Sequence, residues 1–497
     1  MSCLAEADLW VNGEEHDCVA ILLTGAIAGA LLLLVLGPRP APLGPATGDP
    51  AFAEQIAEAL PDGGAGYPAV SAVRITGNDS VWAGFGDVTP ESRFELGSIT
   101  KTFTGLLLAD ATERGELQLT DRLDAYLPEL AGTPVGEVTL EELASHRAGL
   151  PDLGHIDWLE LIAEGMAGAD YSAFREPDPE RVIDDAAAQD LTGRGEWRYS
   201  NLGIALLGQA VTRAAGAPDW PALVGDRLLG PLGMTDTQIS WDRPAPADLV
   251  QPSLSSGRPA APWVGTGYGS AGLGVTTTAA DLTRYAQALL NGSAPGMSAL
   301  EDRWPMAYGQ RIGLAWVTAE VDGRDIVWHN GRTGGSSSML ALDPENDAAV
   351  ILLTNTARDV TGPGFALIGA RGVLPEPPPF DMETIGWVVA GLVTAIAFAV
   401  GAARGRSRLS TVGAGLAAVG SLIMWWLAAP WDWAPPWSFG IALGLSFGAL
   451  VVLLLRWSRV PLLPDRRRWL ALAGLVLGAL WCVAMLAFAI RVLTLQP

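Results

Sequence analysis

Five apolar runs constrain the fold of this 497-residue chain more than any other feature of its sequence. Each is about as long as the roughly 20 residues that a helix needs to cross a bilayer. The runs cover residues 18–36, 385–403, 409–429, 437–455 and 469–490. We therefore predict transmembrane α-helices, with one anchor at the N-terminus and a four-helix region over residues 385–490.

The arginines beside these runs predict the orientation of the chain. Arg404, Arg406 and Arg408 follow the second run, and five further arginines between residues 456 and 468 follow the fourth. Both links should be cytoplasmic, because basic loops stay on that side of a membrane. The link 430–436 has no basic residue and two tryptophans, which is typical of the outer interface. Because each span crosses the membrane once, these assignments predict a multi-pass protein of the plasma membrane, with residues 37–384 outside the cell.

The segments between the runs complete the predicted domain organisation. Residues 1–17 are acidic and lack the basic start of a secretory signal, so we expect a cytoplasmic tail and an uncleaved anchor over 18–36. A cleaved signal remains the alternative. Proline-rich linkers are expected at 37–50 and 376–384, on either side of a soluble domain at 51–375.

Charge and composition exclude several function classes for the soluble domain. From residue 382 onward nine arginines face three acidic residues, a net of +6, so a total of −23 leaves −29 for the rest. Such an acidic surface disfavours nucleic acids and anionic lipid headgroups as partners. The three cysteines lie outside the domain, and its histidines lack the paired spacing of metal ligands, so we expect no metal and no cofactor. The sequence does not indicate an oligomeric state.

Hydrophobic patterning predicts the elements of the soluble domain. Strands are expected at residues 69–75, 80–85, 339–342 and 348–353, and helices at 100–112, 202–214 and 279–290. Strands at both ends with helices between them favour an α+β fold, in which a mixed sheet is covered by helices.

Lys101 is the only lysine in the chain, since the other 30 basic side chains are arginine. A lysine retained under this bias indicates a position that requires loss of the proton near neutral pH, which arginine cannot provide. Ser98 precedes Lys101 by three residues, so on a helix both point to the same side. Serine beside a neutral lysine is one way to activate a nucleophile. The alternative is a solvated surface lysine left over from a coding bias.

Two further motifs carry candidate site residues. Tyr199-Ser200-Asn201 stands just before an expected helix, where the alternative is a packed tyrosine and an N-capping asparagine. His329-Asn330-Gly331-Arg332 lies on an expected strand that runs into a glycine-rich turn, where the alternative is a structural histidine. Gly-x-Ser-x-Gly does not occur around Ser98 or elsewhere in the predicted soluble domain, which disfavours an alpha/beta-hydrolase.

In order and spacing, these three motifs resemble those of the active-site serine penicillin-recognising enzymes. The resemblance is closest to the branch of class C beta-lactamases, D-alanyl-D-alanine carboxypeptidases and related esterases. It extends to the stretches 94–101, 143–151, 199–203 and 230–235, and covers about residues 55–357. It implies a beta-lactamase/DD-peptidase-like fold with a helical subdomain, and it says nothing about the C-terminal helices.

The resemblance also implies a division of roles. Ser98 would attack a carbonyl to form an acyl-enzyme, and Lys101 would take the serine proton. Tyr199 would pass this proton to the leaving group and later activate water, and Asn201 would orient Lys101 and bind the substrate amide. The third motif, with His329, Gly331 and Arg332, would bind substrate.

The third motif departs from the Lys-Thr-Gly form of the family. Lysine at that place supplies a fixed charge for a substrate carboxylate, whereas His329 is expected to be mostly neutral at pH 7. Cleavage of esters, amides or D-amino-acid peptides of peptidoglycan type is therefore favoured over strong beta-lactam hydrolysis. The competing hypothesis is a penicillin-binding-type sensor that is acylated without turnover.

Overall fold

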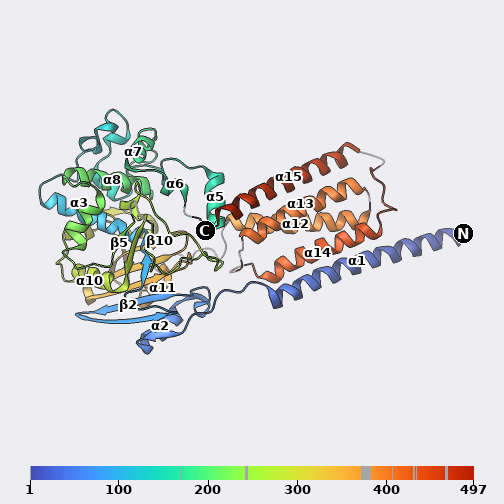
Figure 1. The fold of residues 1–497 in the computed structure, drawn as a ribbon, viewed down its shortest axis with the longest axis horizontal. Helices are drawn as coiled ribbons and strands as arrows, with labels where there is room; N and C mark the ends of the chain where they lie inside the picture. The colour runs from blue at the N-terminus through green and yellow to red at the C-terminus, as the bar shows by residue number, and fades with distance from the viewer. Residues whose placement is uncertain are drawn as a thin grey trace. The chain divides into compact units, whose positions relative to one another are not determined.

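The computed structural model describes residues 2–169, 171–240, 244–370, 382–405, 407–428, 431, 434–464 and 468–496. The chain divides into two compact units (Figure 1). The helical unit comprises residues 1–40 and 377–495, and the soluble unit comprises residues 41–376 together with 496–497. All strands of the described residues belong to the soluble unit.

A nine-stranded antiparallel sheet forms the centre of the soluble unit. Strands from the two ends of the domain meet in its middle, because β12 (Ala348–Thr354) pairs with both β2 (Val70–Thr76) and β11 (Ser337–Asp343). In sheet order the strands are β1 (Ala46–Gly48), β3 (Asp79–Phe85), β2 (Val70–Thr76), β12 (Ala348–Thr354), β11 (Ser337–Asp343), β10 (Arg324–Arg332), β9 (Val317–Val321), β8 (Arg311–Ile312) and β7 (Trp304–Pro305).

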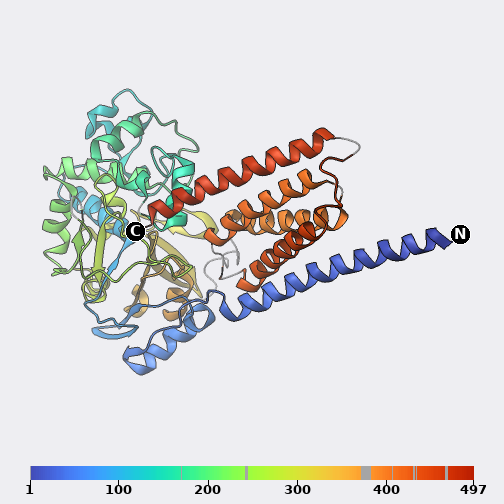
Figure 2. The same ribbon diagram turned by 45° about the vertical axis from the view of Figure 1, so that its right-hand side comes forward.

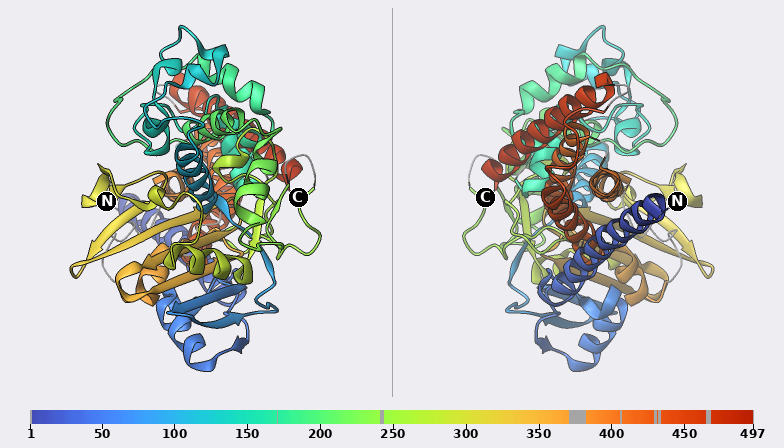
Figure 3. Two further views of the ribbon diagram at one scale, coloured as in Figure 1. Left: turned by 90° about the vertical axis from the view of Figure 1, so that its left-hand side faces the viewer. Right: turned by 90° about the vertical axis from the view of Figure 1, so that its right-hand side faces the viewer.

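Helices cover both faces of this sheet. Side chains alternate along a strand, so on β2 Val73 and Ile75 join the larger core while Val70 and Ala72 join the smaller one. The larger core contains α3 (Thr100–Glu113), α8 (Asn201–Ala214) and α10 (Ala279–Leu290), and the smaller one contains α2 (Pro50–Ala59) and α11 (Thr361–Leu367). Figure 3 shows α2 (blue) and the helices of residues 158–214 (teal to green) on opposite sides of the strands. The helices of this unit are α2 (Pro50–Ala59), α3 (Thr100–Glu113), α4 (Leu140–Ala144), α5 (Trp158–Ala167), α6 (Ser172–Arg175), α7 (Pro179–Ala187), α8 (Asn201–Ala214), α9 (Trp220–Val224), α10 (Ala279–Leu290) and α11 (Thr361–Leu367).

These elements confirm the predicted α+β class. Each predicted strand and helix is present with its ends within two residues of the expected positions. Every strand pair is antiparallel, including those of a second, three-stranded sheet. Its strands are β4 (Arg93–Glu95), β6 (Val275–Thr278) and β5 (Gln238–Ile239).

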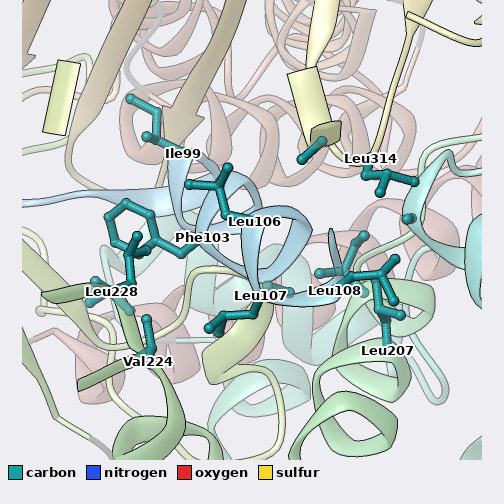
Figure 4. Packing of buried hydrophobic residues seen from close by; sticks show 14 of the residues in the cluster. Ile99, Phe103, Leu106, Leu107, Leu108, Leu207, Val224, Leu228 and Leu314 are labelled. Carbon is teal, nitrogen blue, oxygen red and sulfur yellow. The ribbon is translucent and has the colours of Figure 1, made fainter. Parts of the chain in front are cut away.

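Helix α3 lies in the interior of the soluble unit. Every residue from Thr100 to Ala111 is buried, including five polar or charged ones: Thr100, Lys101, Thr102, Thr104 and Asp110. Figure 4 shows Phe103, Leu106 and Leu107 packed among neighbouring elements. Truncating such a leucine to alanine typically costs about 2–5 kcal/mol. The turn at the start of α3 therefore rests on a rigid support.

The soluble unit begins earlier than the predicted boundary at residue 51. β1 pairs with β3, and the Asp49 side chain accepts a hydrogen bond from Phe52 N at the start of α2. All three residues of β1 are exposed, so no apolar pattern marked this edge strand inside the expected linker 37–50. Most of the predicted linker 376–384 lies outside the described residues, and α12 begins at Met382.

The helical unit contains long apolar helices that match the predicted spans. Among the described residues, five helices are long and apolar enough to cross a membrane, judged by length and composition. They are α1 (Ser2–Leu36), α12 (Met382–Arg404), α13 (Arg408–Ala428), α14 (Pro436–Leu455) and α15 (Arg468–Leu495). Arg406, Arg466, Arg467 and part of the link 430–436, which the orientation prediction used, lie outside the described residues.

Glycines bring α1 and α14 into close contact, as Figure 2 shows for the dark blue helix and its neighbour. A Cβ atom added to Gly25 would overlap the carbonyl oxygen of Gly444, and one added to Gly444 would overlap that of Gly25. Gly29 and Gly440 meet in the same reciprocal way. Small residues spaced by four are typical of tightly packed helices in membranes.

Candidate active site

Ser98 lies in a single turn of 3-10 helix, Gly97–Ile99, that leads directly into α3. Lys101 follows one turn later and is fully buried. Its Nζ donates a hydrogen bond to Ser98 Oγ at 2.8 Å and another to the carbonyl oxygen of Ala271 at 2.5 Å. The sole lysine therefore contacts the hydroxyl directly from within the protein interior.

The environment of Lys101 favours its neutral form. Burial lowers the pKa of Lys101 from 10.5 to about 7, and the more distant carboxylate of Asp152 opposes this shift. A large fraction of the amine is thus unprotonated near neutral pH, and the neutral amine can accept a proton.

Tyr199 completes the cluster from the loop before α8. Its hydroxyl lies 2.8 Å from Ser98 Oγ, and Lys101 Nζ lies 5.0 Å from the centre of its ring. Burial raises the pKa of Tyr199 well above 10, although the hydrogen bond with Ser98 opposes this shift. Tyr199 therefore holds its proton at neutral pH.

His146 packs against Tyr199, with ring centres 4.6 Å apart. Its Nδ1 accepts a hydrogen bond from the backbone N–H of Ser200 at 3.2 Å. Burial, with smaller contributions from Lys101 and His329, holds the pKa of His146 well below 6.5. No local motif assigns His146 to the site, because Tyr199 and Ser200, which it contacts, are more than 50 residues away along the chain.

Asn201 lines the same cavity but contacts a different partner from the one expected. Its side-chain amide donates to Asp152 Oδ1 at 2.8 Å, and its backbone N–H donates to the same oxygen at 3.1 Å. Ala271, rather than Asn201, provides the second hydrogen bond to Lys101. A backbone acceptor of this kind has no side-chain signature, so the sequence could not identify it.

The third motif lies at the end of β10, beside the Ser98 turn. His329 is buried, with Nδ1 2.6 Å from the carbonyl oxygen of Asn330, and burial lowers its pKa to about 4. It is therefore uncharged at pH 7. The Arg332 side chain is exposed and lines the cavity. Within the described residues, its guanidinium makes no hydrogen bond or ion pair.

Glycines allow the backbones of β10 and the Ser98 turn to approach each other. Gly97 has a φ of +59°, and a Cβ atom there would lie 2.7 Å from the Arg332 nitrogen. A Cβ atom on Gly331 would overlap the carbonyl oxygen of Leu96. The Arg332 nitrogen is thereby held against the residue that precedes Ser98.

A cavity of about 200 Å³ opens over this cluster. Four aromatic side chains form much of its wall, and Arg332 is the permanent cation among its lining residues. The lining comprises Gly97, Ser98, Phe174, Tyr199, Asn201, Trp263, Tyr268, Ala271, Gly272, Leu273 and Arg332. Such a cavity is suited to a small substrate with an apolar portion and an anionic or polar end.

Glu95 connects three segments around the cavity and was not identified from the sequence. Its buried carboxylate accepts hydrogen bonds from Trp263 N at 2.7 Å, Thr333 Oγ1 at 2.7 Å and Ser336 Oγ at 2.9 Å. Burial raises its pKa, against the opposing effect of these donors. Glu95 thus fastens the strand before Ser98 to the turn after β10 and to the aromatic wall.

The fold and the serine, lysine and tyrosine at its centre define a serine hydrolase of the beta-lactamase-like class. A family model described as Beta-lactamase matches residues 53–366. The chain therefore belongs to the beta-lactamase family.

Curated relatives are similar over the soluble unit. A beta-lactamase of Escherichia coli (strain K12) is 26% identical over 309 residues, covering 54% of this chain and 76% of the relative. Penicillin-binding protein 4* of Bacillus subtilis (strain 168) is 27% identical over 308 residues, covering 57% of this chain and 65% of the relative.

Solved structures share the fold. A class C beta-lactamase from Rhodobacter sphaeroides has a TM-score of 0.54 at 23% identity, with 64% of this chain and 99% of that chain covered. A D-alanine carboxypeptidase AmpC from Burkholderia cenocepacia has a TM-score of 0.54 at 22% identity, with the same coverage of both chains.

Proposed function

We propose that this protein is a membrane-anchored serine hydrolase that acts outside the cell through an acyl-enzyme on Ser98. Its substrates would be D-amino-acid peptides of peptidoglycan type, or small esters and amides. The observation that carries this proposal is the contact of the fully buried Lys101 amine, with a pKa of about 7, with Ser98 Oγ at 2.8 Å.

In the acylation step, neutral Lys101 takes the Ser98 hydroxyl proton while Oγ forms a bond to the substrate carbonyl carbon. The carbonyl oxygen becomes an oxyanion, which the backbone N–H groups of Ser98 and Arg332 stabilise. When the intermediate collapses, the bond to the leaving group breaks. Tyr199 donates its proton to that group and regains one from the protonated Lys101.

Deacylation consumes one water molecule. The water oxygen attacks the acyl carbon, its proton passes to the Tyr199–Lys101 pair, and the ester bond to Ser98 Oγ breaks as that oxygen regains a proton. These two residues act as a unit, because each bonds to or lies against the same hydroxyl.

The cavity supports a choice among substrates. His329 is uncharged at pH 7, so its position lacks the fixed cation that the lysine of the Lys-Thr-Gly form supplies. Arg332 lines the cavity and is proposed to meet an anionic group of the substrate, while Phe174 and Trp263 would contact its apolar part. A relative named as a penicillin-binding protein and a neighbour named as a D-alanine carboxypeptidase support peptide substrates of this type.

Membrane anchoring is supported by the five long apolar helices and by the packing of α1. The reciprocal contacts of Gly25 with Gly444 and of Gly29 with Gly440 make α1 part of the helical unit. A segment held in this way is expected to stay in the mature protein, which favours a retained anchor over a cleaved signal.

One observation favours the second candidate, a sensor that is acylated without turnover. Burial keeps Tyr199 protonated, which weakens it as a base for deacylation. Such a protein would form a long-lived acyl-enzyme on the same Ser98.

Incubating the full chain in detergent with a fluorescent penicillin and with a fluorophosphonate probe tests both candidates. We expect labelling by the fluorophosphonate on Ser98, and continuous release of product from an activated ester. A single burst of product without turnover would favour the sensor. Labelling that persists in Ser98→Ala would refute both.

A further inference from the structure

Helix α5 presents large apolar side chains to the surface of the soluble unit. Among its described residues, the exposed large hydrophobic side chains are Trp158, Leu159 and Tyr308, with exposed fractions of 65%, 72% and 71%. Two of these three are neighbours in the first turn of α5. Two exposed apolar side chains next to each other call for an explanation, whereas scattered single ones would not.

The burial pattern of α5 is the reverse of that expected for a helix in water. Its buried face consists of Ala163, Glu164 and Ala167, two small side chains and a carboxylate. Its outer face contains Trp158 and, one turn later, the partly exposed Ile162. A surface helix of a soluble protein normally buries its large apolar residues and exposes its charges. This arrangement fits an apolar phase outside α5.

Hydrogen bonds fix α5 in this orientation. At its start, the Asp157 side chain accepts from the backbone N–H groups of Leu159 and Glu160 at 3.0 and 3.2 Å. The inward Glu164 carboxylate accepts from Ser172 N at 3.0 Å. Rotating the apolar face inward would break the contact of Glu164, so the outward face is a property of the fold.

The same segment leads to the wall of the active-site cavity. Just after α5, the Gly168 carbonyl oxygen accepts from Ala261 N at 2.6 Å. Tyr171 contacts Trp263, with ring centres 5.1 Å apart, and Trp263 lines the cavity together with Ser98. Figure 1 labels α5 and the adjacent α6, which carries the lining residue Phe174.

We propose that α5 is a membrane-binding element, whose Trp158, Leu159 and Ile162 enter the headgroup and acyl-chain boundary of a lipid bilayer. Tryptophan prefers this boundary because its ring is apolar and its N–H is polar. The proposal rests on the membrane anchoring proposed above. α1 ends at Leu36 and the soluble unit begins at Ala41, and an extended segment of four residues reaches only about 15 Å, which keeps the soluble unit near the bilayer.

The lipid that fits this surface is zwitterionic. Residues 41–376 of the soluble unit hold 21 basic and 45 acidic residues, a net charge of −24 that repels anionic headgroups, so apolar insertion has to provide the attraction. Bilayer contact at α5 would hold the nearby cavity at the membrane surface. Substrates that are themselves embedded in the membrane would then reach Ser98 more readily.

A depth-dependent fluorescence measurement tests the contact independently of activity. The full chain, with Cys3→Ala, Cys18→Ala and Cys482→Ala, receives a nitrobenzoxadiazole label at Leu159→Cys and is placed in phosphatidylcholine nanodiscs. Tyr308→Cys is the matched control, because its exposure is nearly equal. We expect spin-labelled lipids to quench the label at 159 at least about threefold more than the label at 308.

Equal quenching at both sites, or shielding at 159 without quenching by lipid, would overturn the proposal. The second of these results would mean that protein covers α5, either another part of this chain or a second copy.

An activity comparison separates this proposal from the proposed function. The double variant Trp158→Asp, Leu159→Asp should cleave a long-chain ester embedded in the nanodiscs about tenfold more slowly, because two apolar anchors are lost. Hydrolysis of a short soluble ester should stay unchanged, since neither residue lines the cavity. Equal rates on the embedded ester would refute the membrane role alone, whereas an inactive parent protein would refute the hydrolase function.

Discussion

Glycine permits close backbone approach in both units of this protein, but the atoms brought together differ. In the soluble unit, Gly97 and Gly331 let the β10 backbone lie against the Ser98 turn, next to polar groups with defined partners. In the helical unit, Gly25 and Gly444 let two apolar helices touch. A side chain added to a glycine should therefore have different effects in the two units. In the soluble unit it should lower the reaction rate, and in the helical unit it should weaken the association of two helices.

Removing the reacting groups themselves should have the largest effect. Ser98→Ala and Lys101→Met should each lower kcat/KM for an activated ester by about a thousandfold or more, because the nucleophile or its base is lost. The full chain with p-nitrophenyl acetate provides the measurement. Lys101→Met should unfold at the same temperature or higher, since a desolvated amine is replaced by an apolar chain of similar length. Activity within tenfold of the parent would rule out this chemistry.

Crowding the Ser98 turn is expected to come next. Gly97→Ala should lower kcat about a hundredfold, because the added Cβ would displace the Arg332 nitrogen from the oxyanion position. Gly132→Ala is the matched control, since its φ is +80° but nothing lies within 4 Å of the added atom. Both should lose about 1 kcal/mol of stability from backbone strain. Equal losses of kcat would assign the effect to strain alone.

The pH dependence of acylation tests the role of Lys101 as a base without altering the residues of the site. Below the Lys101 pKa of about 7, each lower pH unit should reduce the rate of fluorophosphonate labelling about tenfold, because the protonated amine cannot act as a base. His329→Gln should leave the midpoint in place, since burial lowers the pKa of His329 to about 4. A rate that stays constant from about pH 5 to pH 9 would exclude Lys101 as the base.

The lowered pKa of Lys101 also makes the stability of the protein depend on pH. Between about pH 7 and pH 10.5 the unfolded lysine holds a proton that the folded one has lost. The contribution of Lys101 to the free energy of unfolding should therefore rise with pH across this window and level off above it. Chemical denaturation of Lys101→Met, which lacks this contribution, provides the comparison.

Crowding the helical unit should affect activity least. Gly444→Leu should change kcat/KM by less than about twofold, because Gly444 belongs to the helical unit and does not line the cavity over Ser98. It should nevertheless separate α1 from α14 and reduce cross-linking between cysteines placed at Ala28 and Leu443, which line one groove. Gly386→Leu is the control, since nothing lies within 4 Å of its added Cβ. Undiminished cross-linking would show that the glycine contact is dispensable.

Apolar periodicity along the sequence predicted most helices and strands of this fold. It did not predict strands that lack buried apolar residues. The helix at 279–290 and the strand at 348–353 were predictable, because apolar periodicity reports burial directly. The edge strand β1 was missed, since its three exposed residues have no apolar pattern.

The candidate site divides in the same way. Ser98 and Lys101 lie one turn apart on a helix, so a single lysine in 497 residues was enough to identify the pair. Tyr199 and the third motif were identified through order and spacing, which carry the family resemblance. Glu95 and Ala271 were missed, because their roles depend on segments more than 160 residues away.

The sequence by itself determined the apolar spans, the acidic soluble domain and the serine, lysine and tyrosine that fall in one cluster. Only the tertiary structure decided that Lys101 donates to Ala271, that Asn201 contacts Asp152 and that α5 turns its apolar face outward. The physical reason is that periodicity and spacing depend on residues that are close along the chain. Burial and the pKa of a buried amine depend instead on groups that folding brings together from distant parts of the sequence.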